Sequence, residues 1–226
     1  MAIRSSELTS SLIPTGVSFF NPNSGALTEF GLRWVKRLFF IAACGPALQV
    51  LVGGILGQLG AEPVDAVTRI TGVWTLNFLM LTLAVAPLRH YLGWFWPLRL
   101  RRMLGLFTFF YASLHLATYL VFEQFFDVAE IFKDILKRPY ITAGMIAYGI
   151  LFLLAMTSTN RMIRHLGKHW KPLHRLVYLA GIAGVLHFFW LVKRDITEPG
   201  IYIIVLCTLL CTRLIRPSRK KTIRPG

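Results

Sequence analysis

Charged side chains are scarce in this sequence, and carboxylates are the scarcest. Only 15% of the 226 residues are charged, 10 of them acidic and 25 basic, whereas 55% are hydrophobic. A chain this apolar is not an ordinary soluble domain, and it has room for several membrane spans of about 20 residues each. The apolar runs are continuous and do not alternate in polarity over strands of about 10 residues, which excludes a transmembrane barrel.

Familiar catalytic motifs are also absent. The sequence contains no P-loop, GxGxxG or hydrolase motif, and no internal repeat is evident. Its three cysteines, Cys44, Cys207 and Cys211, lie in apolar runs, where thiols are most simply packing residues. Cys207 and Cys211 could share a helix face, but two thiols alone make a weak metal site.

Six apolar stretches predict an all-α integral membrane protein, a bundle of six transmembrane helices. Charged, Pro-containing or Gly-containing segments separate the stretches. The expected spans are 35–57, 70–88, 101–123, 140–158, 172–192 and 199–215. The transmembrane domain would cover 33–215, between a flexible N-terminal tail at 1–32 and a basic C-terminal tail at 216–226.

Lys and Arg are distributed unevenly over the connecting segments. Nineteen of the 25 lie in 1–37, 89–102, 161–175 and 213–226, which the six spans place on one side of the membrane. By the positive-inside rule, both termini are therefore predicted to be cytoplasmic. The net charge of +15 is thus a sign of topology, and no soluble basic domain is present to favour a nucleic-acid partner.

Two histidines lie deep in apolar stretches, where imidazole is costly without a partner. His115 lies 14 residues beyond Arg101, and His187 lies 15 beyond Pro172. At 1.5 Å per residue, both lie about 21–22 Å into helices that run in the same direction. Neutral imidazole is a common axial ligand of haem iron, so the pair predicts a bis-histidine haem suited to one-electron transfer. The alternative is that each histidine hydrogen-bonds a neighbouring helix.

His174 lies 13 residues before His187, about 20 Å nearer the cytoplasm, and could ligate a second haem. Its counterpart on the third span is Arg102, which cannot ligate iron because guanidinium stays protonated. Arg99, Arg101 and Arg102 indicate instead an anionic group on this side. A flavin mononucleotide phosphate, haem propionates or anionic lipid would fit, as would no ligand beyond the positive-inside bias.

The remaining histidines lie in basic loops. Loop histidines are usually solvated, which is our expectation for His90 and His165. His169 lies beside Trp170 and five residues before His174, so it could orient a cofactor or contact a partner at the membrane surface.

Several strings in the sequence resemble the MsrQ family, the haem-binding membrane subunits of bacterial periplasmic methionine-sulfoxide reductase systems. They are RLRRMLGL (99–106), SLHLATY (113–119), KRPYITAG (137–144), TSTNRMIRHLGKHWKPLHRLVYL (157–179) and HFFW (187–190). The resemblance runs from about residue 33 to 215. It implies a six-helix ferric-reductase-like transmembrane domain in the bacterial inner membrane.

This resemblance also implies a haem b and an FMN in a subunit that passes electrons to MsrP, a periplasmic molybdopterin enzyme that reduces methionine sulfoxide. The family's haem histidines fall on His115, His174 and His187, and its flavin-associated arginine segment falls on Arg101 and Arg102. Related oxidases carry two histidines on helix three. Because this chain has only His115 there, one haem per chain is expected.

The source of electrons is expected to lie outside the chain. About a dozen residues follow the last expected span, so no FAD-binding and NAD(P)H-binding domain is expected, and a cytoplasmic flavin reductase or a quinol would be the donor. The chain would transfer electrons and leave sulfoxide reduction to its partner. Three alternatives remain: a stand-alone ferric or superoxide-generating reductase, a haem-free transporter or channel, and a membrane anchor.

Overall fold

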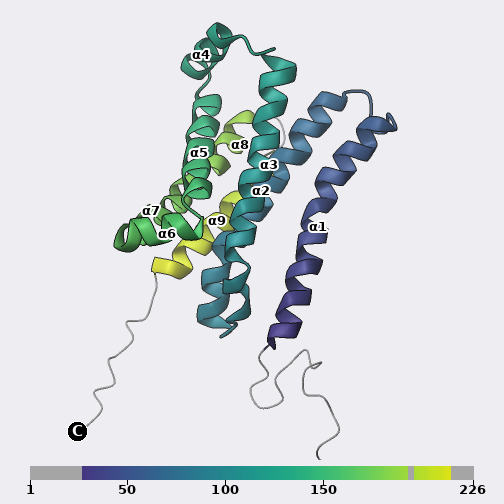
Figure 1. Cartoon of the computed structure of the whole chain (residues 1–226). Helices are drawn as coiled ribbons and strands as arrows, with labels where there is room; N and C mark the ends of the chain where they lie inside the picture. The colour runs from purple at the N-terminus through teal and green to yellow at the C-terminus, as the bar shows by residue number, and fades with distance from the viewer. Residues whose placement is uncertain (1–26, 193–195, 215–226) are drawn as a thin grey trace, which may run out of the picture. The chain divides into compact units, whose positions relative to one another are not determined.

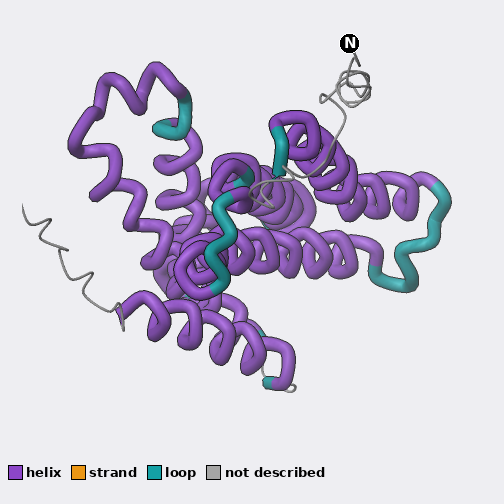
Figure 2. Tube along the Cα trace, turned by 90° about the horizontal axis from the view of Figure 1, so that it is seen from below, coloured by secondary structure: helices purple, strands orange, loops and turns teal. Residues whose placement is uncertain are grey.

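The computed structural model describes residues 27–192 and 196–214, and the elements in these ranges are helical (Figures 1 and 2). Residue contacts divide the chain into two compact units, 1–45 and 46–226. The boundary falls inside α1 (Glu29–Ile55), and the other helices belong to the second unit.

The predicted class, an all-helical membrane protein, is confirmed. Five helical segments in the described ranges are long and apolar enough to cross a membrane: Glu29–Ile55, Pro63–Tyr91, Arg101–Glu123, Pro139–Met156 and Asn160–Leu191. The sixth expected span lies over α9 (Thr197–Leu214), and its last residue, 215, is outside the described ranges. Six crossings and cytoplasmic termini stay predictions. The expected tails lie largely outside the described residues, although α1 begins at Glu29, inside the tail expected at 1–32.

Two helix pairs form the centre of the second unit. The first pair is α2 (Pro63–Tyr91) with α3 (Arg101–Thr118), and the second is α5 (Pro139–Met156) with α8 (Val177–Leu191). The pairs contact each other through α3 and α5 and through α2 and α8, while α9 contacts α2 and α8 (Figure 1). Short elements complete the connections: η1 (Trp96–Arg99), α6 (Asn160–Leu166), η3 (Gly167–His169), α7 (Trp170–Leu173) and η4 (His174–Leu176).

One end of this bundle carries a helix that hydropathy does not predict. After α3, the π-helical turn η2 (Tyr119–Glu123) leads into α4 (Val128–Lys137), from which α5 returns (Figure 1). Asp127 caps α4 by accepting hydrogen bonds from the backbone N–H groups of Ala129 and Glu130 at 2.9 and 3.2 Å. This end is called the α4 end below, and the opposite end of α5, where α6 begins, is called the α6 end.

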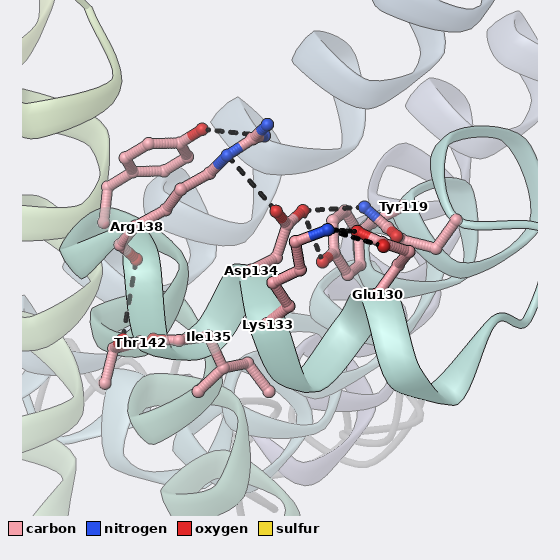
Figure 3. Close-up of polar contacts among 9 residues, drawn as sticks. Tyr119, Glu130, Lys133, Asp134, Ile135, Arg138 and Thr142 are labelled. Carbon is pink, nitrogen blue, oxygen red and sulfur yellow. Dashed lines mark hydrogen bonds and ion pairs between the residues drawn. The ribbon is translucent and has the colours of Figure 1, made fainter.

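Asp134 fastens α4 to η2. This buried carboxylate accepts hydrogen bonds from Gln124 Nε2 at 2.7 Å and from the Tyr119 hydroxyl at 3.3 Å, and it pairs with Arg138 at 3.3 Å (Figure 3). A hydrogen bond to the Tyr140 hydroxyl, together with nearby Asp134, raises the pKa of Arg138. Arg138 is therefore a fixed positive charge at the start of α5.

Replacing Asp134 with alanine is expected to lower the free energy of unfolding by about 1–3 kcal/mol, because two donors and one cation lose their acceptor. Unfolding in mixed detergent micelles would measure the change. The matched control is Glu130→Ala, which removes only the exposed partner of Lys133 and should cost about 0–1 kcal/mol. Equal losses in the two variants would contradict this role of Asp134.

Four threonine hydroxyls inside the spans are satisfied within their own helices. Thr71, Thr75, Thr82 and Thr108 each donate to the carbonyl four residues earlier, at 2.8 to 3.0 Å. The bilayer core offers no water, so internal bonding of this kind lets a threonine sit in an apolar helix. Leucines of α2 and α5 and small residues of α8 fill the core between the two pairs, including Leu79, Leu83, Leu151, Leu154 and Ala180.

Candidate functional site

A cavity of about 810 Å³ opens among α2, α3, α5 and α8 toward the α4 end. Its volume falls in the range of sites for small molecules and cofactors. Its walls are mainly apolar, and both His115 and His187 contribute to them. The two histidines that the sequence places at one depth thus meet in one pocket.

The two imidazole rings lie close together, with their planes nearly perpendicular. Their centres lie 6.1 Å apart and their planes make an angle of 81°. Two metal–nitrogen bonds of about 2 Å each, with a ring radius of about 1.1 Å at either end, span about 6 Å. The separation therefore suits one metal ion bound between the rings. Two imidazoles supply two ligands, so the pair suits a metal that brings its other ligands with it. No group of three or more His, Cys, Asp or Glu that could hold a metal is found within 27–192 and 196–214.

Backbone carbonyls determine which nitrogen of each imidazole ring carries the proton. His115 Nδ1 lies 2.9 Å from the Thr68 carbonyl oxygen, and His187 Nδ1 lies 2.6 Å from that of Tyr140. A carbonyl oxygen can only accept, so each Nδ1 carries the hydrogen and each neutral ring keeps its lone pair on Nε2. A hydrogen bond of this kind orients a ligating histidine and raises its basicity.

Two glycines allow the helices to approach the rings closely. A Cβ atom on Gly72 of α2 would lie 3.0 Å from Cε1 of His115, and one on Gly144 of α5 would lie 2.8 Å from Nδ1 of His187. Real Cβ contacts are essentially never shorter than 3.0 Å. Glycine at positions 72 and 144 therefore leaves the space that each imidazole ring occupies.

The site is built from two equivalent halves, although no repeat is evident from the sequence. Each Nδ1 bond joins residues 47 apart. In each half, a glycine lies four residues after the carbonyl and a small pocket-lining residue lies three before the histidine. The equivalent positions are Thr68 and Tyr140, Gly72 and Gly144, Ala112 and Gly184, and His115 and His187. In the sequence, this equivalence is marked by the glycine pair and by a short pattern of a small residue, any residue, Leu and His at 112–115 and again at 184–187.

Comparison with known proteins assigns the family. Residues 71–185 match the family described as "Ferric reductase like transmembrane component". A protein of Herminiimonas arsenicoxydans named "Protein-methionine-sulfoxide reductase heme-binding subunit MsrQ" is 46% identical over 206 residues, which is 90% of this chain and 92% of that protein. A protein of the same name from Azospira oryzae is 50% identical, covering 83% and 82%. The chain belongs to the MsrQ family. No solved structure matches it.

The other site residues that the sequence predicts lie at the α6 end. His174 does not line the histidine pocket. Its Nε2 lies 3.2 Å from the Thr157 hydroxyl, and its ring stacks on Trp170 with ring centres 4.1 Å apart. Trp170 Nε1 donates to the Thr157 carbonyl at 3.0 Å, so the three residues form one cluster. Half-buried Arg101 is near enough for its positive charge to act on His174.

The remaining predicted residues at this end are more exposed. Arg102 donates to the Asn160 side-chain oxygen at 2.8 Å and so ties α3 to α6. Arg99 and His169 are exposed. Arg101 thus acts electrostatically on His174, and the roles predicted for all five residues at this end stay predictions.

Proposed function

We propose that this chain is a haem b-binding electron-transfer subunit of a methionine-sulfoxide reductase system in the bacterial inner membrane. The observation that carries the proposal is the imidazole pair, with its centres 6.1 Å apart and both Nδ1 atoms committed to carbonyls. The names of its relatives support a haem as the bound group. His115 and His187 would ligate the iron. When bound, such a haem supplies a one-electron couple with no open iron position.

The chain's own residues orient the ligands and exclude water. The Thr68 and Tyr140 carbonyls hold the rings, and apolar walls such as Leu76 and Leu151 lower the local dielectric around the site. A haem held in this way would lie in an apolar environment, and its iron would exchange no ligand during electron transfer. These features favour electron transfer over substrate chemistry at the metal.

The distribution of charge gives the direction of transfer. The positive-inside rule makes the α6 end cytoplasmic and the α4 end periplasmic. The histidine pocket then lies toward the periplasm, where MsrP would accept electrons and reduce methionine sulfoxide in oxidised proteins. A cytoplasmic flavin reductase or a quinol would supply the electrons.

FMN is the proposed occupant of the α6 end. Arg101 contributes positive charge beside His174 and Trp170, and each guanidinium offers five donors to a phosphate. Arg99, Arg102 and His169 would complete the anionic site or its approach. His174 lies outside the histidine pocket, and its Nε2 contacts the Thr157 hydroxyl, which supports a role for this histidine in the proposed FMN site.

Stopped-flow reoxidation of the dithionite-reduced protein would test this function. We expect MsrP with methionine sulfoxide to reoxidise the haem far faster than methionine sulfoxide alone. The ferric-reductase-like family match makes a stand-alone reductase the second candidate. Rapid reoxidation by a ferric chelate or by oxygen, with no response to MsrP, would support that candidate and contradict the proposal.

A further inference from the structure

The two halves of the histidine pocket are related by an approximate two-fold rotation. One half comes from α2 and α3, and the other from α5 and α8. In both, the first helix starts at the α4 end and the second helix ends there. The equivalent contacts therefore imply a rotation axis that runs along the bundle and passes between His115 and His187. Leu116 and Phe188 continue the equivalence along the walls.

The pocket is polar at its mouth and apolar at its floor. The charged lining residues cluster at the α4 end: Asp65, Arg69, Glu123 and Glu198. Arg69 pairs with Glu198 at 2.8 Å, and guanidinium keeps further donors for a carboxylate. The floor toward the α6 end contains Leu76, Ala147, Tyr148 and Leu151. A haem has one carboxylate edge and an opposite hydrocarbon edge. The apolar floor suits the vinyl and methyl groups, which leaves the carboxylates at the polar mouth.

A two-fold pocket alone cannot decide which way round a haem sits. A half-turn about the axis keeps the carboxylates at the mouth and both imidazoles on the iron. Only the vinyl and methyl groups at the floor exchange places. Selection between the two orientations therefore depends on residues that differ between the halves at the floor.

Tyr148 is the main difference at the floor. Its equivalent in the first half, 72 residues earlier, is Leu76. Tyr148 is held in place because it stacks on Phe109, with ring centres 5.9 Å apart, and its hydroxyl lies 3.4 Å from Ser113 Oγ. A rigid aromatic ring thus faces one half of the floor and a smaller, flexible side chain faces the other.

We propose that Tyr148, opposite Leu76, determines which of the two orientations the haem adopts. This inference rests on the proposed haem site and adds a specificity-determining residue to it. Tyr148 selects through its shape, because neither it nor Leu76 is a ligand of the iron. The difference between Tyr148 and Leu76 would therefore decide which side of the haem faces α2 and α3 and which side faces α5 and α8.

Proton NMR of the ferric, haem-loaded protein in detergent tests the proposal, because each orientation gives its own set of shifted haem-methyl signals. We expect one predominant set in the unaltered protein. Tyr148→Leu and Leu76→Tyr each remove the difference between positions 76 and 148, so each should move the two populations toward equality. The double exchange, Leu76→Tyr with Tyr148→Leu, should reverse the preference.

Phe152→Leu is the matched control. Phe152 packs against Tyr148 but does not line the cavity, so its removal should leave the orientation ratio close to that of the unaltered protein. Unchanged populations in both Tyr148→Leu and Leu76→Tyr would overturn the role of Tyr148. If one of these two variants fails to take up haem, the other decides the question. Failure of the unaltered protein to bind haem would contradict the proposed function itself, a result distinct from the outcomes for Tyr148.

Discussion

Alanine at His115 or at His187 is expected to abolish stable haem binding. Each substitution removes one of the two Nε2 donors and leaves a carbonyl, that of Thr68 or Tyr140, without its imidazole partner. A single remaining histidine would hold the iron weakly in a cavity that is open toward the α4 end. Haem per chain, extracted from purified protein and quantified, should fall from about one to near zero in either variant.

His174→Ala is the matched control for these two substitutions. His174 lies in the same candidate membrane span as His187, but it contacts Thr157 and Trp170 outside the histidine pocket. We expect His174→Ala to retain the haem of the pocket. Normal haem content in His115→Ala and His187→Ala would refute the ligand assignment, and equal loss in His174→Ala would make His174 a ligand.

Gly144→Ala is expected to have the next largest effect. Alanine in a helix interior is normally more stable than glycine by about 1 kcal/mol, so a loss at this position would have to come from contact with the imidazole. The added Cβ would stand 2.8 Å from His187 Nδ1, where the ring already donates to Tyr140. The ring would have to shift, which would move His187 Nε2 away from the position at which it would ligate the iron. A severalfold loss of haem, with a high-spin fraction in what remains, is the expected optical result.

The same helix provides the control for Gly144→Ala. Gly149 also lies in α5, and a Cβ added there would meet nothing within 4 Å. Gly149→Ala should therefore keep full haem content and a low-spin spectrum. Gly72→Ala, with its closest contact at 3.0 Å, should show a milder form of the Gly144→Ala defect. Identical spectra for Gly144→Ala and Gly149→Ala would show that close approach to His187 is unimportant.

The parts of the fold that sequence predicts well are those that the membrane itself imposes. A span must satisfy its backbone hydrogen bonds internally, so a continuous apolar run has little choice except a helix. Residue counts then convert directly into depth, because helices rise by a constant amount per residue. Counting from Arg101 and from Pro172 placed His115 and His187 at one level, and the structure brings them together.

Other features could not be predicted from the sequence, because they depend on tertiary contacts or on backbone atoms. The helix α4 is short, and its place depends on the Asp127 cap and on Asp134 contacts with Gln124 and Tyr119. The carbonyl partners of the histidines are hidden from sequence, since every residue type carries a carbonyl.

The approximate two-fold symmetry of the pocket could not be predicted from the sequence for a related reason. It is visible only once contacts are known, because few identical residues, such as Gly72 with Gly144 and His115 with His187, recur at the separation of 72. The repeated geometry is carried by a carbonyl, a glycine and a small residue in each half. Such a pattern is too sparse to stand out in a chain rich in Leu, Ala and Gly.

The most direct test of the central claim is the low-temperature electron paramagnetic resonance spectrum of the ferric, haem-loaded protein. Two imidazoles on one iron give a low-spin signal, and ring planes at 81° to each other should make that signal strongly anisotropic. We predict such a spectrum as the main species at about one haem per chain. A predominantly high-spin signal, or folded protein that binds no haem despite adequate supply, would contradict ligation by His115 and His187.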